Sequence, residues 1–271
     1  MKLPRAVALT LCLVQFGVLL GGCSASHKAT HPPPGSAGSS TSTAPAAGTL
    51  VIFASTQLKP AFDQLEIQFA AANPGVSATA TYQGSQALVT AVQAGAQGDL
   101  FATDADPIDA LAAAGAVVTS TVQTFARNEL EIVVPAGNPK GIQGLQDLAN
   151  PGVSVVLADP SLPAGKDAVT ALALAGVKVT PKASVSTVAQ LITAILSGNA
   201  DVGMAFRSDV VAGGSGVAGV ALPAGNPVEE TYRIGVLRNA ANPTSASAFV
   251  QFVHSERGRA ILAAAGFVPG S

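Results

Sequence analysis

The chain has 271 residues, with 14 Lys and Arg against 16 Asp and Glu and a formal net charge of −2 at pH 7. A mildly acidic chain without a basic run is unsuited to nucleic acid, whose phosphates are bound by clustered Lys and Arg, so we expect no nucleic-acid partner. Both cysteines, Cys12 and Cys23, lie near the N-terminus. The rest of the chain therefore has no thiol for a disulfide, a metal site or a nucleophile.

Residues 1–22 have the pattern of a secretion signal. Lys2 and Arg5 precede an uncharged, mostly apolar stretch, 6–20, which is shorter than the about 20 residues of a membrane span. The stretch ends in Leu20-Gly-Gly-Cys23, which resembles the bacterial lipobox of an aliphatic residue, two small residues and cysteine. The resemblance implies cleavage before Cys23 and a lipid on Cys23 that anchors the chain at the outer face of the cytoplasmic membrane, in the cell envelope or periplasm. An uncleaved anchor is the alternative.

Residues 23–48 are rich in Ser, Thr, Ala, Pro and Gly and have almost no apolar side chain to bury. Such a segment cannot offset the entropy cost of ordering, so we expect a flexible tether. The remaining residues, 49–271, are enough for one large domain or two lobes.

From residue 50 onward, short apolar runs alternate with segments of helical period. In chain order, the pattern predicts a strand at 50–53, a helix from 58 to 69, a strand at 76–82, a helix around 88–92, a strand at 100–102, a helix from 106 to 114, a strand at 130–135, a short helix at 144–148, a strand at 153–158, helices at 164–175 and 188–196, strands at 202–206 and 232–237, and helices at 245–254 and 256–265. This alternation predicts an α/β fold with a mainly parallel sheet covered by helices on both faces. In such folds, ligands bind beyond the carboxyl ends of the strands, near helix N-termini.

Catalytic constellations are missing from this part of the sequence. Its one histidine, His254, falls on a predicted helix, and no nucleophile elbow, phosphate loop or zinc motif is present. Asp104 and Asp106 follow a strand and offer a cation site, but capping of the next helix by Asp106 before Pro107 is the favoured interpretation. The sequence therefore predicts neither an enzyme nor a cofactor.

Small polar residues recur where a strand gives way to a helix. They lie at 55–57, 83–86, 163–165 and 186–188. Free backbone N–H groups beside hydroxyls at such turns bind anions without a formal positive charge. Each turn alone is also explained by helix capping, whereas all of them together indicate an anion-binding protein.

Several motifs in this order have a counterpart in one known family. They are Val51-Ile-Phe-Ala54 with Leu58, Gly84-Ser85 with Leu88, Gly98-Asp-Leu-Phe-Ala102 with Asp104 and Asp109, Ala158-Asp-Pro160 with Pro163-Ala-Gly165, Gly203-Met-Ala-Phe206 with Ser208-Asp209, and Gly258-Arg-Ala-Ile-Leu262 with Gly266-Phe267. Over about residues 50–268 the chain resembles the molybdate-binding proteins of ABC importers, a branch of the bacterial periplasmic binding-protein family. The resemblance implies a two-lobed fold with two crossing hinge strands: lobe one at 49–130 plus 232–271, and lobe two at 131–231.

The resemblance also implies a set of pocket residues. The family's first pocket serine falls on Gln57 and its second on Ser85, its two backbone donors fall on Ala164 and Val188, and its tyrosine falls on Phe206. Gln57 replaces a hydroxyl with an amide that still donates, whereas Phe206 has no donor. If the first turn is shifted by one residue relative to the family, the hydroxyl of Ser55 or Thr56 compensates for the lost donor.

The function implied by this resemblance is capture of a tetrahedral oxyanion, molybdate or tungstate, by a monomer that delivers it to an ABC permease in the cytoplasmic membrane. The absence of Trp and the scarcity of Tyr argue against a sugar or iron ligand. Two alternatives stay open: a binding protein for sulfate or phosphate, and an envelope scaffold without a small ligand.

Overall fold

The computed structural model describes residues 48–223 and 228–270. The predicted signal at 1–22, the lipidation site at Cys23 and the predicted tether lie outside the described residues, apart from Gly48. Gly48 was assigned to the tether, but it begins the first strand, where its N–H donates to Gly75 O at 3.0 Å. Within the two described ranges, no helix has the length and apolar character needed to cross a membrane.

The first half of the described chain alternates strands and helices. Its elements are β1 (Gly48–Ser55), η1 (Thr56–Leu58), α1 (Lys59–Ala72), β2 (Val76–Gln83), α2 (Ser85–Gln93), β3 (Leu100–Asp104), α3 (Ala105–Ala113), η2 (Thr119–Thr121) and the long β4 (Gln123–Pro135). The helical spacing of Phe62, Leu65 and Phe69 puts one face of α1 in the core, as predicted.

The second half continues the alternation with shorter elements. They are η3 (Leu145–Ala149), β5 (Val155–Ala158), α4 (Pro163–Leu174), β6 (Ala183–Val185), α5 (Val188–Leu196), β7 (Val202–Phe206), α6 (Arg207–Ala212), η4 (Gly214–Gly216), β8 (Val217–Ala221), β9 (Glu229–Val236), α7 (Pro243–His254), α8 (Glu256–Ala264) and β10 (Val268–Pro269). Thr187 caps α5 by accepting the Gln190 N–H at 3.2 Å.

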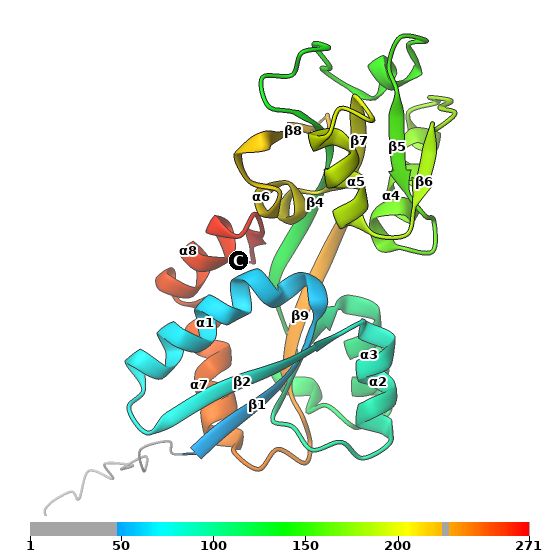
Figure 1. Cartoon of the computed structure of the whole chain (residues 1–271). Helices are drawn as coiled ribbons and strands as arrows, with labels where there is room; N and C mark the ends of the chain where they lie inside the picture. Colours follow the sequence, from blue (N-terminus) through cyan, green and yellow to red (C-terminus); the bar gives the residue numbers. More distant parts are fainter. Residues whose placement is uncertain (1–47, 224–227, 271) are drawn as a thin grey trace, which may run out of the picture. The chain divides into compact units, whose positions relative to one another are not determined.

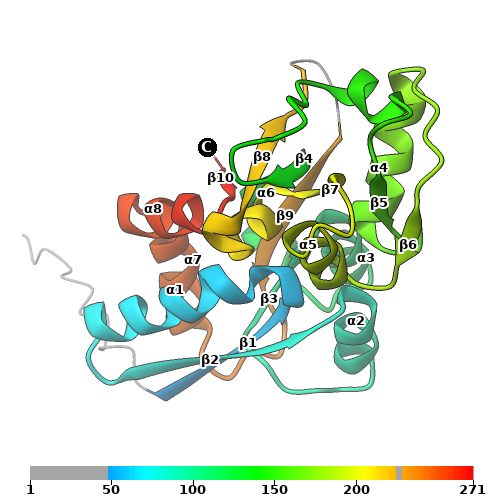
Figure 2. The same cartoon turned by 45° about the horizontal axis from the view of Figure 1, so that its top comes forward.

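The strands form one mixed sheet in the order β2-β1-β3-β9-β4-β7-β5-β6, and β8 and β10 also pair with β4. The outer pairs, β1 with β2 and β3 and β5 with β6 and β7, are parallel. Every described pairing of β4 and β9 is antiparallel, and the two strands run side by side in Figures 1 and 2. The α/β class is confirmed, but the sheet is less parallel than we expected because β4 and β9 carry the chain out and back through its centre.

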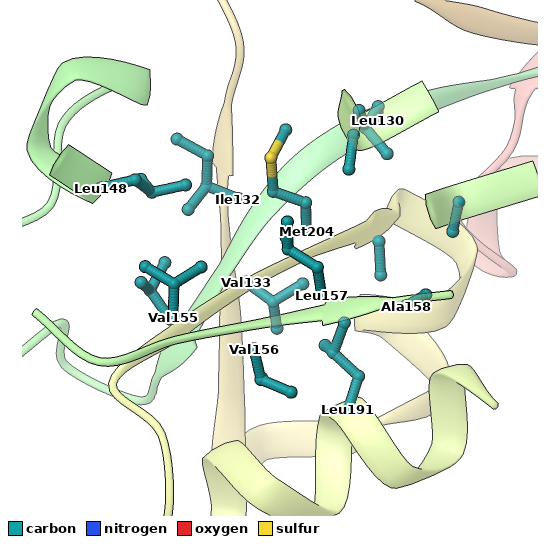
Figure 3. Packing of buried hydrophobic residues seen from close by; sticks show 14 of the residues in the cluster. Leu130, Ile132, Val133, Leu148, Val155, Val156, Leu157, Ala158, Leu191 and Met204 are labelled. Atoms are coloured by element: carbon teal, nitrogen blue, oxygen red, sulfur yellow. The ribbon is translucent and has the colours of Figure 1, made fainter. Parts of the chain in front are cut away.

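The buried side chains gather in clusters on the two sides of this strand pair. Alternate residues of β1 face opposite sides, so that Leu50 and Ile52 pack with α1, α7 and α8 while Phe53 packs with α2 and α3. A separate cluster is built from residues 130–228, and Figure 3 shows Leu130, Ile132 and Met204 within it. Residues 48–270 nevertheless form one compact unit, and the division into two lobes stays a prediction.

The helices and strands that we did not predict from the sequence are short or have no clear periodicity of apolar residues. The structure adds β6, β8, β10 and the six-residue α6. Asp106 does not cap α3, because Asp104 occupies the N-cap position and Asp106 lies in the first turn.

Gly165, in the first turn of α4, lies close to the backbone at the end of β5. A Cβ added there would lie 2.1 Å from Asp159 O and 2.5 Å from Ala158 O, both backbone atoms that cannot swing away. Gly165→Ala should therefore push α4 off the end of β5 and lower the free energy of unfolding by roughly 1–3 kcal/mol.

Urea denaturation followed by circular dichroism measures this loss. The matched control is Gly152→Ala, where an added Cβ meets no atom within 4 Å. Equal stability of the two variants would contradict the packing described for Gly165.

Candidate functional site

A cavity of about 380 Å³ brings together residues from two separate stretches of the chain. One stretch comprises η1 and the start of α1. The other comprises the turns that open α4 and α5, together with the end of β7 and α6. The lining residues are Thr56, Gln57, Pro60, Leu162, Pro163, Ala164, Ser186, Thr187, Val188, Phe206, Ser208, Asp209 and Ala212.

Most of the predicted site residues meet in this cavity. Thr56, Gln57, Ala164, Val188 and Phe206 all line it. Two predicted residues do not: Ser55, which lies just before Thr56, and Ser85. The Ser85 hydroxyl instead donates to Asp104 Oδ1 at the end of β3.

A larger cavity of about 520 Å³ lies among β5, β6, α4 and the loop after α4. Its lining is mainly apolar, with Lys178 and Ser184 as polar exceptions, and includes none of the predicted residues. Size alone would favour it, but the smaller cavity has the chemistry for binding a polar ligand because hydrogen-bond donors converge there.

Two helix N-termini open into the smaller cavity. Pro163 is the first residue of α4, so Ala164 carries the first N–H of that helix, and Val188 is the first residue of α5. N–H groups in a helix's first turn have no partner within the helix and sit at the positive end of its dipole. Thr187 satisfies only the Gln190 N–H of α5. Ala164 and Val188 therefore offer backbone donors fixed by α4, of 12 residues, and α5, of nine.

Charged side chains are nearly absent from the cavity wall. Among the described residues that line it, Asp209 alone is charged. Arg207 is the nearest cation in sequence, but it is exposed and its Nη1 lies 3.9 Å from Glu129 Oε2. The lining thus favours neutral hydrogen bonding over ion pairing. His254 lies at the end of α7 and does not line the cavity.

Asp209 is held against the end of β7. Burial raises the pKa of Asp209 from 3.8 to about 6, although its carboxylate accepts the Phe206 N–H at 3.1 Å, which lowers the pKa. From the sequence, Asp209 was only one residue of the family-like motif at 203–209, because its burial depends on tertiary contacts. Ser208, which the sequence also failed to identify as a site residue, lies beside it in the lining.

The Ser55 hydroxyl is fully buried and has no hydrogen-bond partner among the described residues. It belongs to the last residue of β1, at the N-cap position of η1. A buried hydroxyl without a partner costs about 1–3 kcal/mol of desolvation. Ser55 precedes the lining residue Thr56 in the sequence, and nothing in the described structure offsets this cost.

Ser55→Ala should consequently leave the free energy of unfolding of the unliganded chain unchanged or raise it by about 1 kcal/mol. The control is Ser154→Ala, which loses a hydroxyl that donates to Asp201 Oδ2 at 2.8 Å and should be destabilising. Chemical denaturation compares the two variants. A loss at Ser55 as large as that at Ser154 would show that the Ser55 hydroxyl has a stabilising partner.

The raised pKa of Asp209 makes stability depend on pH. Between about pH 4 and 6 the native state holds a proton on Asp209 that the unfolded chain has released, so the Asp209 contribution to stability falls as pH rises through this window. Asp209→Asn should flatten the variation of the melting temperature across that window.

Thermal unfolding followed by circular dichroism from pH 4 to pH 7.5 measures the difference between the unaltered chain and the variant. Asp106→Asn, at an exposed position of α3, is the control. A difference curve for Asp209→Asn that is as flat as the control curve would contradict the raised pKa.

Comparison with known proteins identifies the family of the chain. The family model for bacterial extracellular solute-binding proteins matches residues 50–268. The molybdate-binding protein ModA of Mycobacterium tuberculosis H37Rv is 35% identical over 222 residues, which are 82% of this chain and 85% of that protein. A substrate-binding domain assigned to a molybdenum ABC transporter of Clostridium difficile superposes with a TM-score of 0.74 at 25% identity, covering 82% of this chain and 99% of that one. The periplasmic molybdate-binding protein of Azotobacter vinelandii shares the fold, with a TM-score of 0.66 at 20% identity over 82% of this chain and all of that one. The chain therefore belongs to the bacterial extracellular solute-binding protein family, as its resemblance implied.

Proposed function

We propose that this solute-binding protein captures molybdate in the 380 Å³ cavity and delivers it to the permease of an ABC importer. As a member of its family it is a carrier and not an enzyme. The M. tuberculosis relative, named for molybdate binding, and the C. difficile domain, assigned to a molybdenum transporter, support this ligand.

One structural observation carries the proposal. Gln57, Ala164, Val188 and Phe206 are far apart in sequence, yet all line a single cavity. They are also positions that the resemblance to molybdate-binding proteins assigns to the pocket. Neutral donors that converge from separate turns are suited to a tetrahedral anion, whose oxygens point in different directions.

The chemistry of the lining accounts for selectivity by size. Molybdate and sulfate both carry two negative charges near neutral pH, so net charge cannot separate them. A set of fixed N–H and O–H donors binds tetrahedral anions of one size best. Because no cation pairs with the anion, release requires only that the walls of the cavity move apart.

Two positions differ from the family's pattern, and we assign each a consequence. Gln57 donates through its amide, whereas Phe206 removes a hydroxyl donor. A missing hydrogen bond to a charged ligand costs about 1.5–3 kcal/mol, or roughly one to two decades of affinity. We propose that Thr56, exposed in the lining, and the Ser55 hydroxyl, which has no partner among the described residues, supply further donors at the same turn as Gln57.

Ser85 remains a proposed ligand of the anion, although in this structure its hydroxyl is engaged by Asp104. Release from Asp104 would free that hydroxyl to donate elsewhere. Closure of lobe two (131–231) upon lobe one (49–130 plus 232–271), about β4 and β9, would complete the cavity around the ligand.

The cellular setting is also part of the proposal. We propose that lipid on Cys23 anchors a monomer to the outer face of the cytoplasmic membrane, with residues 23–47 as the tether. The family's extracellular location and the lipobox-like residues 20–23 support this arrangement.

Isothermal titration of the chain with molybdate, tungstate, sulfate and phosphate tests the function. We expect tight 1:1 binding of molybdate and tungstate, whose similar tetrahedra fit the same set of donors, and at least about tenfold weaker binding of sulfate, equivalent to 1.4 kcal/mol. Equal affinity for all four anions, or binding of none, would contradict the proposal.

A further inference from the structure

Ser208 is a lining residue that the family's pocket pattern does not include. It follows β7 by two residues, its side chain is 7% exposed, and it shares the cavity wall with Phe206. Ser208 comes two residues after Phe206, the position where the family's tyrosine donor is missing.

Asn128 fixes the direction of the Ser208 hydroxyl. The Asn128 Oδ1 accepts the Ser208 N–H at 3.3 Å, which identifies the other end of the amide as its NH₂ group. That Nδ2 then donates to Ser208 Oγ at 2.8 Å. Ser208 Oγ is thus an acceptor in this pair, and its own hydrogen points to another partner.

The environment of Asn128 makes this orientation rigid. Asn128 is fully buried on β4, directly across from Glu230 on the paired β9. Two hydrogen bonds to one serine leave the amide little freedom to flip, because turning it would place NH₂ against N–H.

The hydrogen of the Ser208 hydroxyl is uncommitted within the protein. Among residues 48–223 and 228–270, no hydrogen bond has Ser208 Oγ as its donor. The carboxylate of Asp209 next to it is engaged by the Phe206 N–H at 3.1 Å. A buried hydroxyl that already accepts one bond, in a residue of the cavity lining, is suited to donate to a bound acceptor.

We propose that Ser208 donates its hydroxyl hydrogen to the oxyanion bound in this cavity, in place of the donor absent at Phe206, and that Asn128 is the positioning residue that aims it. The inference rests on the proposed function and adds to it a donor that the family pattern does not assign. It also explains why a pocket with Phe206 retains enough donors for a dianion.

Titration of the full chain with sodium molybdate tests the role of Ser208. Ser208→Ala should weaken molybdate binding by roughly 10- to 100-fold, since a hydrogen bond to a charged ligand is lost. The matched control is Ser247→Ala on α7, whose hydroxyl donates to Pro243 O outside the cavity, and it should bind as the unaltered chain does. An affinity of Ser208→Ala within about twofold of the unaltered chain, a change below 0.5 kcal/mol, would overturn the assignment.

A double-mutant cycle tests Asn128. If Asn128 acts through Ser208, Asn128→Ala weakens binding in the unaltered chain but causes no further loss in the Ser208→Ala background. Equal losses in both backgrounds would overturn the positioning role and point to a structural one. Circular dichroism confirms that each variant is folded at the titration temperature. Failure of the unaltered chain to bind molybdate would instead contradict the proposed function itself.

Discussion

The antiparallel pairing of β4 with β9 joins the two halves of the sheet. β4 pairs with β7, β8, β9 and β10, and β9 also pairs with β3, so the elements that line the cavity are connected through these two strands. The pair is irregular between Thr124 and Ala126, where the register shifts. Asn128, in the same strand, then places a buried polar group under α6. The β4–β9 pair therefore connects the sheet. Through Asn128 it also orients Ser208 in the cavity wall.

The cavity uses partial charges in place of full ones. The first N–H groups of α4 and α5, the Gln57 amide and nearby hydroxyls supply positive ends of dipoles, while Asp209 supplies the one formal charge of the described lining. An anion bound beside Asp209 would further disfavour its carboxylate form, on top of the burial that already raises the Asp209 pKa to about 6. Weak, numerous donors suit a carrier, because the ligand must be held against water and yet released to a permease.

Helices and strands were predicted correctly where the apolar residues of a short segment repeat with a clear period. The helix at 188–196 and the strand at 202–206 were predicted to the residue, because apolar side chains repeat clearly and Gly198 separates the two segments. The prediction failed for elements that tertiary contacts stabilise. The six-residue α6 packs closely against the turn at Gly266. The two-residue β10 is defined by its pairing with β4. In the site, the family resemblance assigned Ala164 and Val188 to the pocket and both line the cavity, whereas the orientation of Ser208 depends on Asn128, 80 residues away. Ser85 was predicted for the pocket but is engaged by Asp104, a partner that no sequence spacing reveals.

The function proposed for this protein requires that the 380 Å³ cavity is the oxyanion site. The most direct measurement is a crystal structure of the molybdate complex, with the metal located by its anomalous scattering. We expect a single strong molybdenum peak in the cavity, with molybdate oxygens about 2.7–3.1 Å from the backbone nitrogens of Ala164 and Val188. A peak elsewhere, for example beside Lys178 in the larger cavity, would contradict it.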